Sequence, residues 1–458
     1  MKKVRVLFVV SVLTMLVFTA CDRTPTEDTP TNVPSVTGMV SMTPKVEESD
    51  ITSNRELYID VVIEVLKNDL FLARDCYDSC HYLMVPLYFA FQEKDVRMIN
   101  AFQTLFDRFC NMSQDQKDEF NSLSGLAKNH FYYLASEYMS LCVKYGYEYD
   151  EVLFYNVLGY ITEYYDNWHG NWAAYKQYND FGALMEGLLE GSGYESDNSL
   201  NNIITDNENF PLAILCDLRY IANTKEYDVG CYREYLESGY KYAKEMMQSK
   251  VVWKEYGGWE FQPGEWRDHS DFSYAGYYNC EDVQDGIYKR VDGIVEDSSH
   301  FIRMACFLNS FERCENDEMF RKLKNGLATQ FKFKVLVNPS SECVYFRTTN
   351  YMNGYNGLFN YSNEVGYEEY GLSKTFLVGW WALLGDETIQ EAYTYTNEML
   401  SKTSSIPVEY GDVKTTREQN PIFMSKEYFE ALCYFASKLH VDNVDAYIEN
   451  SPTFEGTY

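Results

Sequence analysis

The sequence predicts an all-α protein, an (α/α) toroid in which antiparallel helical hairpins form an inner and an outer ring. From residue 55 onward, apolar residues recur at spacings of three and four, with few strand-like alternations. Signals that end one helix and start the next lie close together, which implies short loops and antiparallel neighbours. No motif of about 34 or 40 residues recurs, so a closed ring is favoured over a solenoid. We expect long, irregular, aromatic-rich loops at one mouth of this ring.

Composition and charge exclude several classes of protein. The chain has 458 residues, 39 of them Lys or Arg and 69 Asp or Glu, which gives a net charge of -30. A chain this acidic repels phosphate, so nucleic acid is not expected as a partner. Hydrophobic residues make up 46% of the chain, which is enough to form a core and excludes a disordered protein. Only one segment is long and apolar, which excludes a membrane protein with several spans.

That apolar segment is typical of a signal peptide over residues 1–20. Lys2, Lys3 and Arg5 precede it, and Thr-Ala precedes Cys21. The segment is shorter than the roughly 20 residues that a spanning helix needs. The Thr-Ala-Cys run resembles a bacterial lipobox, although Phe18 stands where an aliphatic residue is usual. This resemblance implies lipidation of Cys21 and export to the bacterial cell envelope, at the outer membrane or the periplasmic face; simple secretion is the alternative.

Residues 21–50 read as the lipidated Cys and a flexible tether. They are rich in Thr, Pro and Ser, and four prolines keep the segment extended. Residues 51–440 are predicted to form the helical domain, and residues 441–458 a C-terminal tail. Eleven cysteines follow Cys21, an odd number whose spacing identifies no disulfide. Cys76, Cys80 and His81 have no second ligand pair, so we expect no metal and no cofactor.

The helical periodicity and its punctuation place the elements in order. Ser113 with Gln116 is a capping box, Gly146 and Gly385 are helix ends, and Asn420-Pro421 is a helix start. We predict helices near residues 55–92, 96–111, 115–143, 148–165, 170–190, 209–223, 228–249, 298–313, 317–330, 368–384, 387–402 and 421–439. Asp150 and Asp386 each open the helix that follows them.

Two helix-poor segments, 251–297 and 335–367, interrupt this pattern and are rich in Gly, Asn and aromatic residues. Loops of this length in a compact domain are usually functional. Sugar rings stack on aromatic faces and form hydrogen bonds to charged and amide side chains. The alternative is that tyrosine, which is abundant throughout, reflects an AT-rich genome and that the loops only cover one end of the ring. The candidate sugar-binding residues are Trp259, Trp266, Tyr274, Arg303, Arg347 and Tyr351, with a smaller aromatic patch at residues 167–172.

His300 is the leading candidate for an acid or base. It follows Asp297-Ser298-Ser299, a helix-start signature, and a helix N-terminus favours the neutral imidazole. His269, beside Asp268, is the second candidate. A carboxylate pair is a further possibility, with Glu265, Asp268 or Asp271 set against Glu296 or Asp297. The alternative for His300 is a purely local capping or packing role.

The runs GWEFQPGEWRDHSDFSYAGY, GIVEDSSHFIRMACFLNSF and LSKTFLVGWWALLGD resemble secreted bacterial proteins with six-hairpin (α/α) toroids. That group includes glycoside hydrolases, polysaccharide lyases and uronate-acting enzymes. The resemblance covers about residues 165–400 and implies an active site in the loops at one mouth of the ring. No single family's catalytic signature matches, so the resemblance assigns no residue a role.

These observations together predict a glycan-degrading envelope lipoprotein that binds a poly- or oligosaccharide. A hydrolase is favoured over a lyase because the negative charge of the chain repels polyanions. Arg303 and Arg347 would bind a uronate carboxylate if the substrate is acidic. The alternatives are a non-catalytic glycan-binding lipoprotein and a structural envelope lipoprotein.

Overall fold

The structure is a computed structural model that describes residues 48–168, 178–190, 202–284, 286–361, 366–411 and 420–440. The chain divides into two units, Met1–Glu47 and Glu48–Tyr458, and every described residue belongs to the second. The predicted signal peptide, Cys21, most of the tether, the tail at 441–458 and most of the patch at 167–172 lie outside the described residues. The helical body begins at Glu48, inside the segment predicted as a tether.

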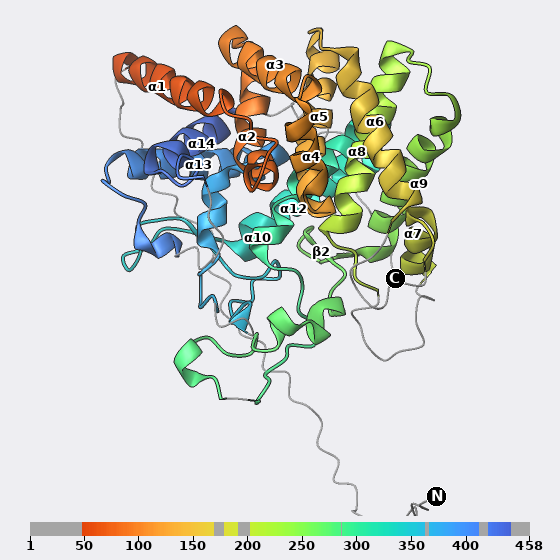
Figure 1. The fold of residues 1–458 in the computed structure, drawn as a ribbon. Helices are drawn as coiled ribbons and strands as arrows, with labels where there is room; N and C mark the ends of the chain where they lie inside the picture. The colour runs from red at the N-terminus through yellow and green to blue at the C-terminus, as the bar shows by residue number, and fades with distance from the viewer. Residues whose placement is uncertain are drawn as a thin grey trace, which may run out of the picture. The chain divides into compact units, whose positions relative to one another are not determined.

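The prediction of an all-α protein is confirmed, because helices dominate the described residues (Figure 1). The α-helices are α1 (Glu48–Leu66), α2 (Asp75–Gln92), α3 (Val96–Cys110), α4 (Gln114–Ser122), α5 (Gly125–Tyr145), α6 (Glu151–Asp166), α7 (Phe181–Glu190), α8 (Asp206–Lys225), α9 (Arg233–Lys250), α10 (Ser298–Phe301), α11 (Met304–Glu315), α12 (Glu318–Gln330), α13 (Glu387–Ser401) and α14 (Lys426–Lys438). The strands form two antiparallel pairs, β1 (Val251–Trp253) with β2 (Trp259–Phe261) and β3 (Leu336–Val337) with β4 (Arg347–Thr348). None of the described helices is long and apolar enough to cross a membrane.

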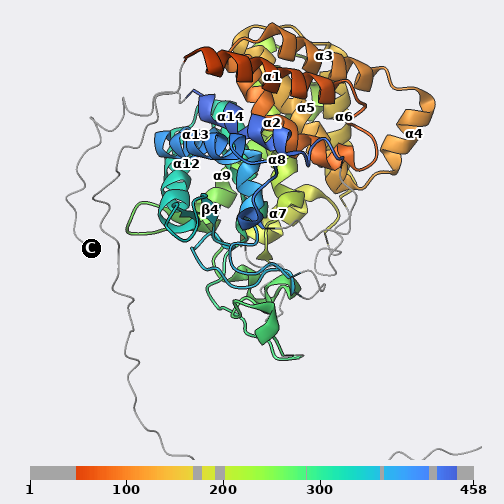
Figure 2. The same cartoon turned by 90° about the vertical axis from the view of Figure 1, so that its left-hand side faces the viewer.

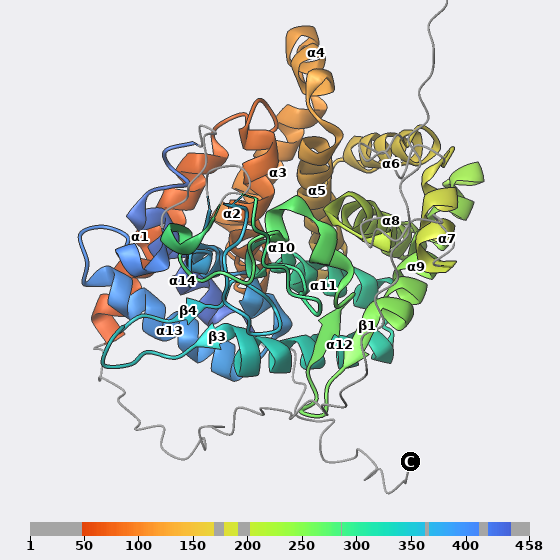
Figure 3. The same cartoon turned by 90° about the horizontal axis from the view of Figure 1, so that it is seen from below.

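The helices pack in an order that returns to its start. α2 packs on α5, α5 on α8 and α8 on α11; α11 then contacts the 3₁₀ segment η10 (Trp380–Leu384). η10 contacts α14, and α14 packs on α2. A second set of helices packs against the first. In this set, α3 contacts α2, α6 contacts α5 and α8, and α9 contacts α8. Further along the chain, α12 contacts α11 and α13 contacts α14, while α1 contacts both α14 and α3. Figures 2 and 3 show the same arrangement from the side and from below.

Most of the predicted caps are confirmed. Ser113 and Gln116 form both bonds of a capping box at α4. Gly146 ends α5 and Gly385 ends η10, both in the left-handed conformation that glycine adopts without steric cost. Asp150 and Asp386 accept backbone hydrogen bonds at the starts of α6 and α13. Asn420-Pro421 is not a helix start, because α14 begins at Lys426, where the Ser425 side chain caps it.

Four of the predicted helices are divided in the structure. The helix predicted at 55–92 is interrupted between Leu66 and Asp75, where Ala73 has a φ of 48°. The helix predicted at 115–143 breaks at Ser124, whose side chain caps α5. The segment 298–313 is divided into α10 and α11. The segment 368–384 forms η9 (Ser373–Val378) and η10 instead of one α-helix, with Gly379 between them.

Two prolines inside helices leave carbonyl groups that tyrosines satisfy. Proline has no N–H, so the carbonyl oxygen four residues earlier loses its helical partner. For Pro86 in α2, that carbonyl belongs to Tyr82, and the Tyr428 hydroxyl donates to it at 2.9 Å. For Pro211 in α8, it belongs to Asn207, and the Tyr164 hydroxyl donates to it at 3.3 Å. These bonds tie α2 to α14 and α8 to α6.

Candidate functional site

A cavity of about 170 Å³ lies where α5, α8 and α10 begin. Its wall comes from the first turns of α5 and α8, from the loop after β2, and from the segment that enters α10. The lining residues are Leu126, Thr205, Asp206, Asn207, Trp266, His269, Asp271, Phe272, Glu296, Asp297, His300 and Phe359. The cavity therefore gathers four carboxyl groups, two imidazoles and three aromatic side chains from segments far apart in the sequence.

The start of α8 places Asp206 and Asn207 at the cavity. Thr205 caps the helix, and its hydroxyl accepts a hydrogen bond from the Asn207 backbone N–H at 3.2 Å. Glu208 completes the capping box by accepting from the Thr205 N–H at 2.7 Å. The two residues inside this box therefore have a fixed position in the wall.

Arg303 holds Asp206 from beneath the cavity. Its side chain is 5% exposed and forms an ion pair and hydrogen bond with Asp206. The same guanidinium donates to His81 Nε2 and to the Tyr77 hydroxyl, each at 3.0 Å. Burial and the charge of Arg303 lower the pKa of His81 well below its ordinary value, so the imidazole is neutral and accepts this bond. Arg303 is thus held on several sides and does not line the cavity.

Asp297 and His300 form a hydrogen-bonded pair at the cavity wall. His300 Nδ1 lies 2.7 Å from Asp297 Oδ2, and Asp297 Oδ1 accepts from the backbone N–H groups of Ser299 and His300 at 3.0 Å each. Burial would raise the pKa of Asp297, but His300 and the hydrogen bonds outweigh it and lower the pKa. The carboxylate is therefore ionised, and Nδ1 of His300 carries the proton that joins the pair.

The hydrogen bond to Asp297 uses Nδ1 of His300 and leaves Nε2 to exchange a proton with a substrate. The His300 side chain is 44% exposed, whereas that of Asp297 is 2% exposed. Burial would lower the pKa of His300, but the charge of Asp297 and its hydrogen bond raise it above the ordinary value. With the proton fixed on Nδ1, Nε2 of the neutral ring has a free lone pair at the cavity and is a stronger base than an isolated imidazole.

Glu296 is a buried carboxyl group beside this pair. Its residue is 7% exposed and lines the cavity. Burial raises the pKa of Glu296 well above its ordinary value, and the negative charges of Asp206 and Asp297 raise it further. A carboxyl group whose pKa is raised in this way is suited to act as a general acid.

His269 is the second imidazole in the wall. Its Nδ1 accepts a hydrogen bond from the Asp271 backbone N–H at 3.1 Å, so this nitrogen carries no proton. Burial lowers the pKa of His269; Asp271 partly opposes that effect, and His300 adds to it. His269 is therefore neutral and carries its proton on Nε2, which makes it a hydrogen-bond donor rather than a base.

The apolar part of the wall is aromatic. Trp266 and Phe272 are stacked, with ring centroids 5.1 Å apart and planes at 20°. The Trp266 indole Nε1 is buried and has no hydrogen-bond partner among the described residues. Phe359 lies within 5.6 Å of Phe272 and 6.0 Å of His300, measured between ring centroids. Aromatic rings beside acid–base groups suit a ligand with both apolar faces and hydroxyl groups.

The second helix-poor segment supports the turn that carries Asp297. Ser298 donates from its N–H to the Asn350 carbonyl at 2.8 Å and from its hydroxyl to the Thr349 carbonyl at 2.7 Å. The Met352 N–H donates to the Glu296 carbonyl at 3.1 Å. The segment 349–352 thus fixes the backbone of the cavity wall, although it does not line the cavity.

Of the predicted catalytic residues, the cavity brings together His300, Asp297 and His269. Asp268 lies apart from them: it does not line the cavity, and its carboxylate accepts from Arg290 at 3.0 Å. Of the predicted sugar-binding residues, Trp266 alone lines the cavity among the described residues.

The other predicted sugar-binding residues have different surroundings. Trp259 is 1% exposed and donates to the Leu323 carbonyl at 2.7 Å, so its rings belong to the core. Tyr351 is fully buried, with its hydroxyl on the Leu358 carbonyl at 2.6 Å. Tyr274 packs on Tyr361 with centroids 4.8 Å apart. The Arg347 guanidinium lies 3.9 Å from the centroid of Tyr370. Burial leaves Trp259, Tyr351 and Arg303 no face for a sugar.

Sequence reasoning missed Asp206 and the start of α8. The run Thr205 to Glu208 is a capping-box pattern, which marks a helix start but does not indicate that this start faces a cavity. The sequence indicates Asp271 and Glu296 only as possible members of a carboxylate pair. Their importance depends on burial and on neighbours that the sequence does not specify.

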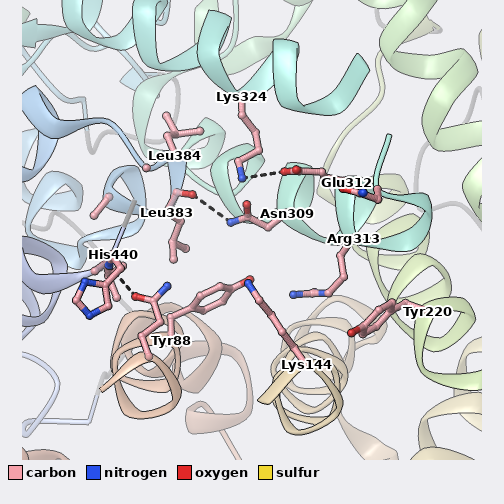
Figure 4. A pocket seen from close by; sticks show the side chains of 15 residues that line it. Tyr88, Lys144, Tyr220, Asn309, Glu312, Arg313, Lys324, Leu383, Leu384 and His440 are labelled. Atoms are coloured by element: carbon pink, nitrogen blue, oxygen red, sulfur yellow. Dashed lines mark hydrogen bonds and ion pairs between the residues drawn. The ribbon is translucent and has the colours of Figure 1, made fainter. Parts of the chain in front are cut away.

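A second cavity, of about 320 Å³, lies at the ends of α2, α5 and α11 (Figure 4). Two of its cationic side chains are paired with carboxylates. Lys324 contacts Glu312 at 2.9 Å, and Arg313 contacts Glu137 and Asp217 at 2.8 and 2.7 Å. These groups are neutralised by neighbouring helices, so this cavity offers less reactive chemistry than the one at His300.

No protein-family model matches the chain, and no curated protein and no solved structure matches it.

Proposed function

We propose that this protein is a carbohydrate-active enzyme that hydrolyses glycosidic bonds in the cavity at His300. The observation that carries the proposal is that one wall of the cavity holds both a group that can accept a proton and a group that can donate one. The Asp297–His300 pair supplies a base, and Glu296, whose pKa is raised well above its ordinary value, supplies a proton. Hydrolysis of a glycosidic bond needs both groups at once.

Each group has a defined task in this mechanism. His300 Nε2 takes a proton from the attacking water, and Asp297 stabilises the imidazolium that forms. Glu296 gives its proton to the oxygen of the leaving sugar. Trp266 and Phe272 offer apolar surface to a sugar ring, and His269 donates a hydrogen bond from Nε2. Arg303 positions Asp206 without touching the substrate.

The charge of the wall favours a neutral glycan over a uronate polymer. No lysine or arginine is found among the described residues that line the cavity, whereas four carboxyl groups are. A lyase must stabilise the carboxylate of its uronate substrate, which needs a positive charge nearby. The net charge of -30 repels polyanions as well. Hydrolysis of a neutral glycan is therefore the reaction that this wall supports best.

The fold and the location complete the proposal. The order in which α2, α5, α8, α11, η10 and α14 contact one another supports an (α/α) toroid of six hairpins, with the cavity and the long aromatic loops at one mouth. The signal peptide and Cys21 support an exported lipoprotein anchored to the bacterial cell envelope.

A panel of polysaccharides tests the reaction. The full chain, solubilised in detergent, is incubated with xylan, mannan, galactan and β-glucan, and with polygalacturonate and alginate. We expect new reducing ends from a neutral polymer, without the ultraviolet absorbance of an unsaturated product. Unsaturated product from a uronate polymer would establish a lyase instead. Binding without release of reducing ends would establish a glycan-binding lipoprotein.

Three variants test the site. Glu296→Gln and His300→Ala should each lower the hydrolysis rate by about 10²–10⁴-fold, the usual contribution of one general acid or base. Asp268→Asn is the matched control, because Asp268 is a nearby carboxylate that pairs with Arg290 outside the cavity. If the control loses as much activity as the other two variants, the assignment of the site is wrong.

A further inference from the structure

A groove of about 910 Å³ runs between α6 and the corner where α3 meets α4. Figure 3 shows α4 projecting beside α5 and α6. The lining residues are Phe109, Cys110, Met112, Lys117, Phe120, Asn121, Gly125, Lys128, Tyr132, Val152, Tyr155, Asn156, Gly159, Tyr160, Glu163, Tyr164 and Asn167. Its volume lies in the range of about 300–1,000 Å³ that ligand sites usually have, whereas the cavity at His300 is smaller.

One face of α6 forms a long side of this groove. Tyr155, Gly159 and Glu163 are spaced four apart, so they lie on one face of the helix. Tyr155 is 43% exposed, although an aromatic ring of this size is usually more deeply covered. Tyr160 stacks on Tyr132 with centroids 4.0 Å apart and planes at 19°. Tyr155 therefore leaves part of its ring exposed beside the groove.

The polar side chains of the groove include amides, positively charged groups and a negatively charged group. Asn121, Asn156 and Asn167 are exposed amides, and Lys117 and Glu163 are exposed charges of opposite sign. Two lysines, Lys117 and Lys128, and the single carboxylate of Glu163 are the charged groups of this lining; aromatic faces interleaved with amides and so few charges suit a neutral, hydroxyl-rich chain. They do not suit a polyanion, which needs a continuous positive surface.

The walls of the groove and the cavity are neighbours at two points. Gly125 lines the groove, and its chain neighbour Leu126 lines the cavity. Tyr164 lines the groove, and its hydroxyl donates to the carbonyl of Asn207, which lines the cavity, at 3.3 Å. Because Pro211 leaves that carbonyl without a helical partner, the bond fixes α6 against the start of α8. The two hollows therefore lie on neighbouring parts of α5, α6 and α8.

We propose that the groove binds the continuation of the glycan chain whose scissile bond lies in the cavity. This inference rests on the proposed function and specifies its substrate as a polysaccharide rather than a short oligosaccharide. The cavity is too small for several sugar rings, so the rest of the chain needs a second surface that adjoins it. The groove adjoins the cavity and has the aromatic and amide groups that bind sugar rings.

Gly159→Trp tests the groove without disturbing the fold. Gly159 is exposed on α6, and no atom lies within 4 Å of where its Cβ would be, so a large side chain fills the groove and meets no backbone. Asn325→Trp is the matched control, because Asn325 is an exposed helical residue of α12 outside the groove. The melting temperature of each variant confirms that it folds.

The measurement is kcat/KM on a long and a short probe. The probes are the polymer that the panel identifies and its trisaccharide, such as xylan with xylotriose or mannan with mannotriose. We expect Gly159→Trp to lower kcat/KM on the polymer at least about tenfold, as blocking one aromatic contact does, and to leave the trisaccharide nearly unchanged. Equal effects on both probes, or no effect on either, would overturn the proposal.

A binding experiment distinguishes a failure of this proposal from a failure of the proposed function. Gel electrophoresis in the presence of xylan, mannan, galactan or β-glucan measures binding by Glu296→Gln, which keeps the groove and lacks the acid. Retarded migration that Gly159→Trp abolishes supports the groove even if no polymer is hydrolysed. Unretarded migration in all four polymers overturns it. Dimerisation of the unmodified chain that Gly159→Trp abolishes, measured by light scattering, would also overturn it, because a second copy would then fill the groove.

Discussion

Asp297 both starts a helix and orients a base. Its Oδ1 accepts from the backbone of Ser299 and His300, as an N-cap does, and its Oδ2 accepts from the His300 ring. The cap needs only an acceptor oxygen, whereas the negative charge of the carboxylate raises the pKa of His300. A replacement that keeps the cap and removes the charge therefore isolates the electrostatic contribution of this residue.

Asp297→Asn is that replacement. Without the carboxylate, the pKa of His300 falls, so the acid side of the pH profile of kcat/KM should move to lower pH. The rate at the optimum should fall by about 10²–10⁴-fold, because the imidazolium loses its counter-charge. The profile is measured on the substrate from the panel, with Asp268→Asn as the control. An acid side that stays in place or moves to higher pH would contradict the role of Asp297.

The candidate site could be predicted where its residues are neighbours in sequence. Asp297 and His300 are three residues apart in a helix-start pattern, and the motif indicates their contact directly. The ion pair between Arg303 and Asp206 joins residues 97 positions apart, and no local pattern indicates it. Trp259 and Trp266 look alike in sequence, yet one belongs to the core and the other to the cavity wall.

At the scale of elements, the 3₁₀ segments η9 and η10 show where periodicity misleads. Trp380, Trp381 and Leu384 are all buried, so this stretch has no exposed face from which to judge a helical period. Gly379 separates the two segments with a φ of 91°, which is a costly conformation for a residue with a Cβ. Its added Cβ would also lie 3.2 Å from Val85 Cγ2 and from Ala436 Cβ.

Gly379→Ala should therefore destabilise the protein by about 1–3 kcal/mol through backbone strain and crowding. Gly293→Ala is the control, because Gly293 is exposed, has no positive φ, and has no atom within 4 Å of its added Cβ. Scanning calorimetry should show a lower melting temperature for the first variant and little change for the second. Equal melting temperatures would show that the chain adjusts around position 379 without strain.

Helix ends were predicted more reliably than helix continuity. A cap is a local interaction, and the Ser113–Gln116 box and the glycines at 146 and 385 form as the sequence indicates. The break between α1 and α2 depends on Ala73, a residue that favours helices and yet has a positive φ here. Tertiary packing decides such positions, so the sequence does not indicate them.

At the scale of the whole molecule, a buried ionic cluster joins three of the central helices. Arg313 of α11 contacts Glu137 of α5 and Asp217 of α8, and both carboxylate side chains are fully buried. Burial and the charge of Glu137 raise the pKa of Asp217 to about 7, although Arg313 opposes this effect. The cluster therefore has one carboxylate more than its single cation can neutralise.

This excess makes stability depend on pH. Because the pKa of Asp217 is higher in the folded than in the unfolded chain, the folded state binds more protons between about pH 4 and pH 7, and stability falls as pH rises through that window. Asp217→Asn should flatten this fall, because the amide does not titrate; its oxygen can still accept from Arg313, and its NH2 group can donate to the Ser136 hydroxyl, which now donates to Asp217. Melting temperatures from pH 5 to pH 8 measure the slope, with exposed Asp118→Asn as the control. Identical slopes in all three proteins would rule out Asp217 as the source.

The contact that closes the helical order joins the two ends of the described body. α14 packs on α1 and α2, and the Tyr58 hydroxyl donates to Glu430 across 372 positions of sequence, at 2.5 Å. A ribosome makes α14 long after α1 and α2, so these two helices wait for their partner until the residues up to Lys438 have been synthesised. Folding of this core therefore depends on contacts between residues far apart in the sequence, which slows it.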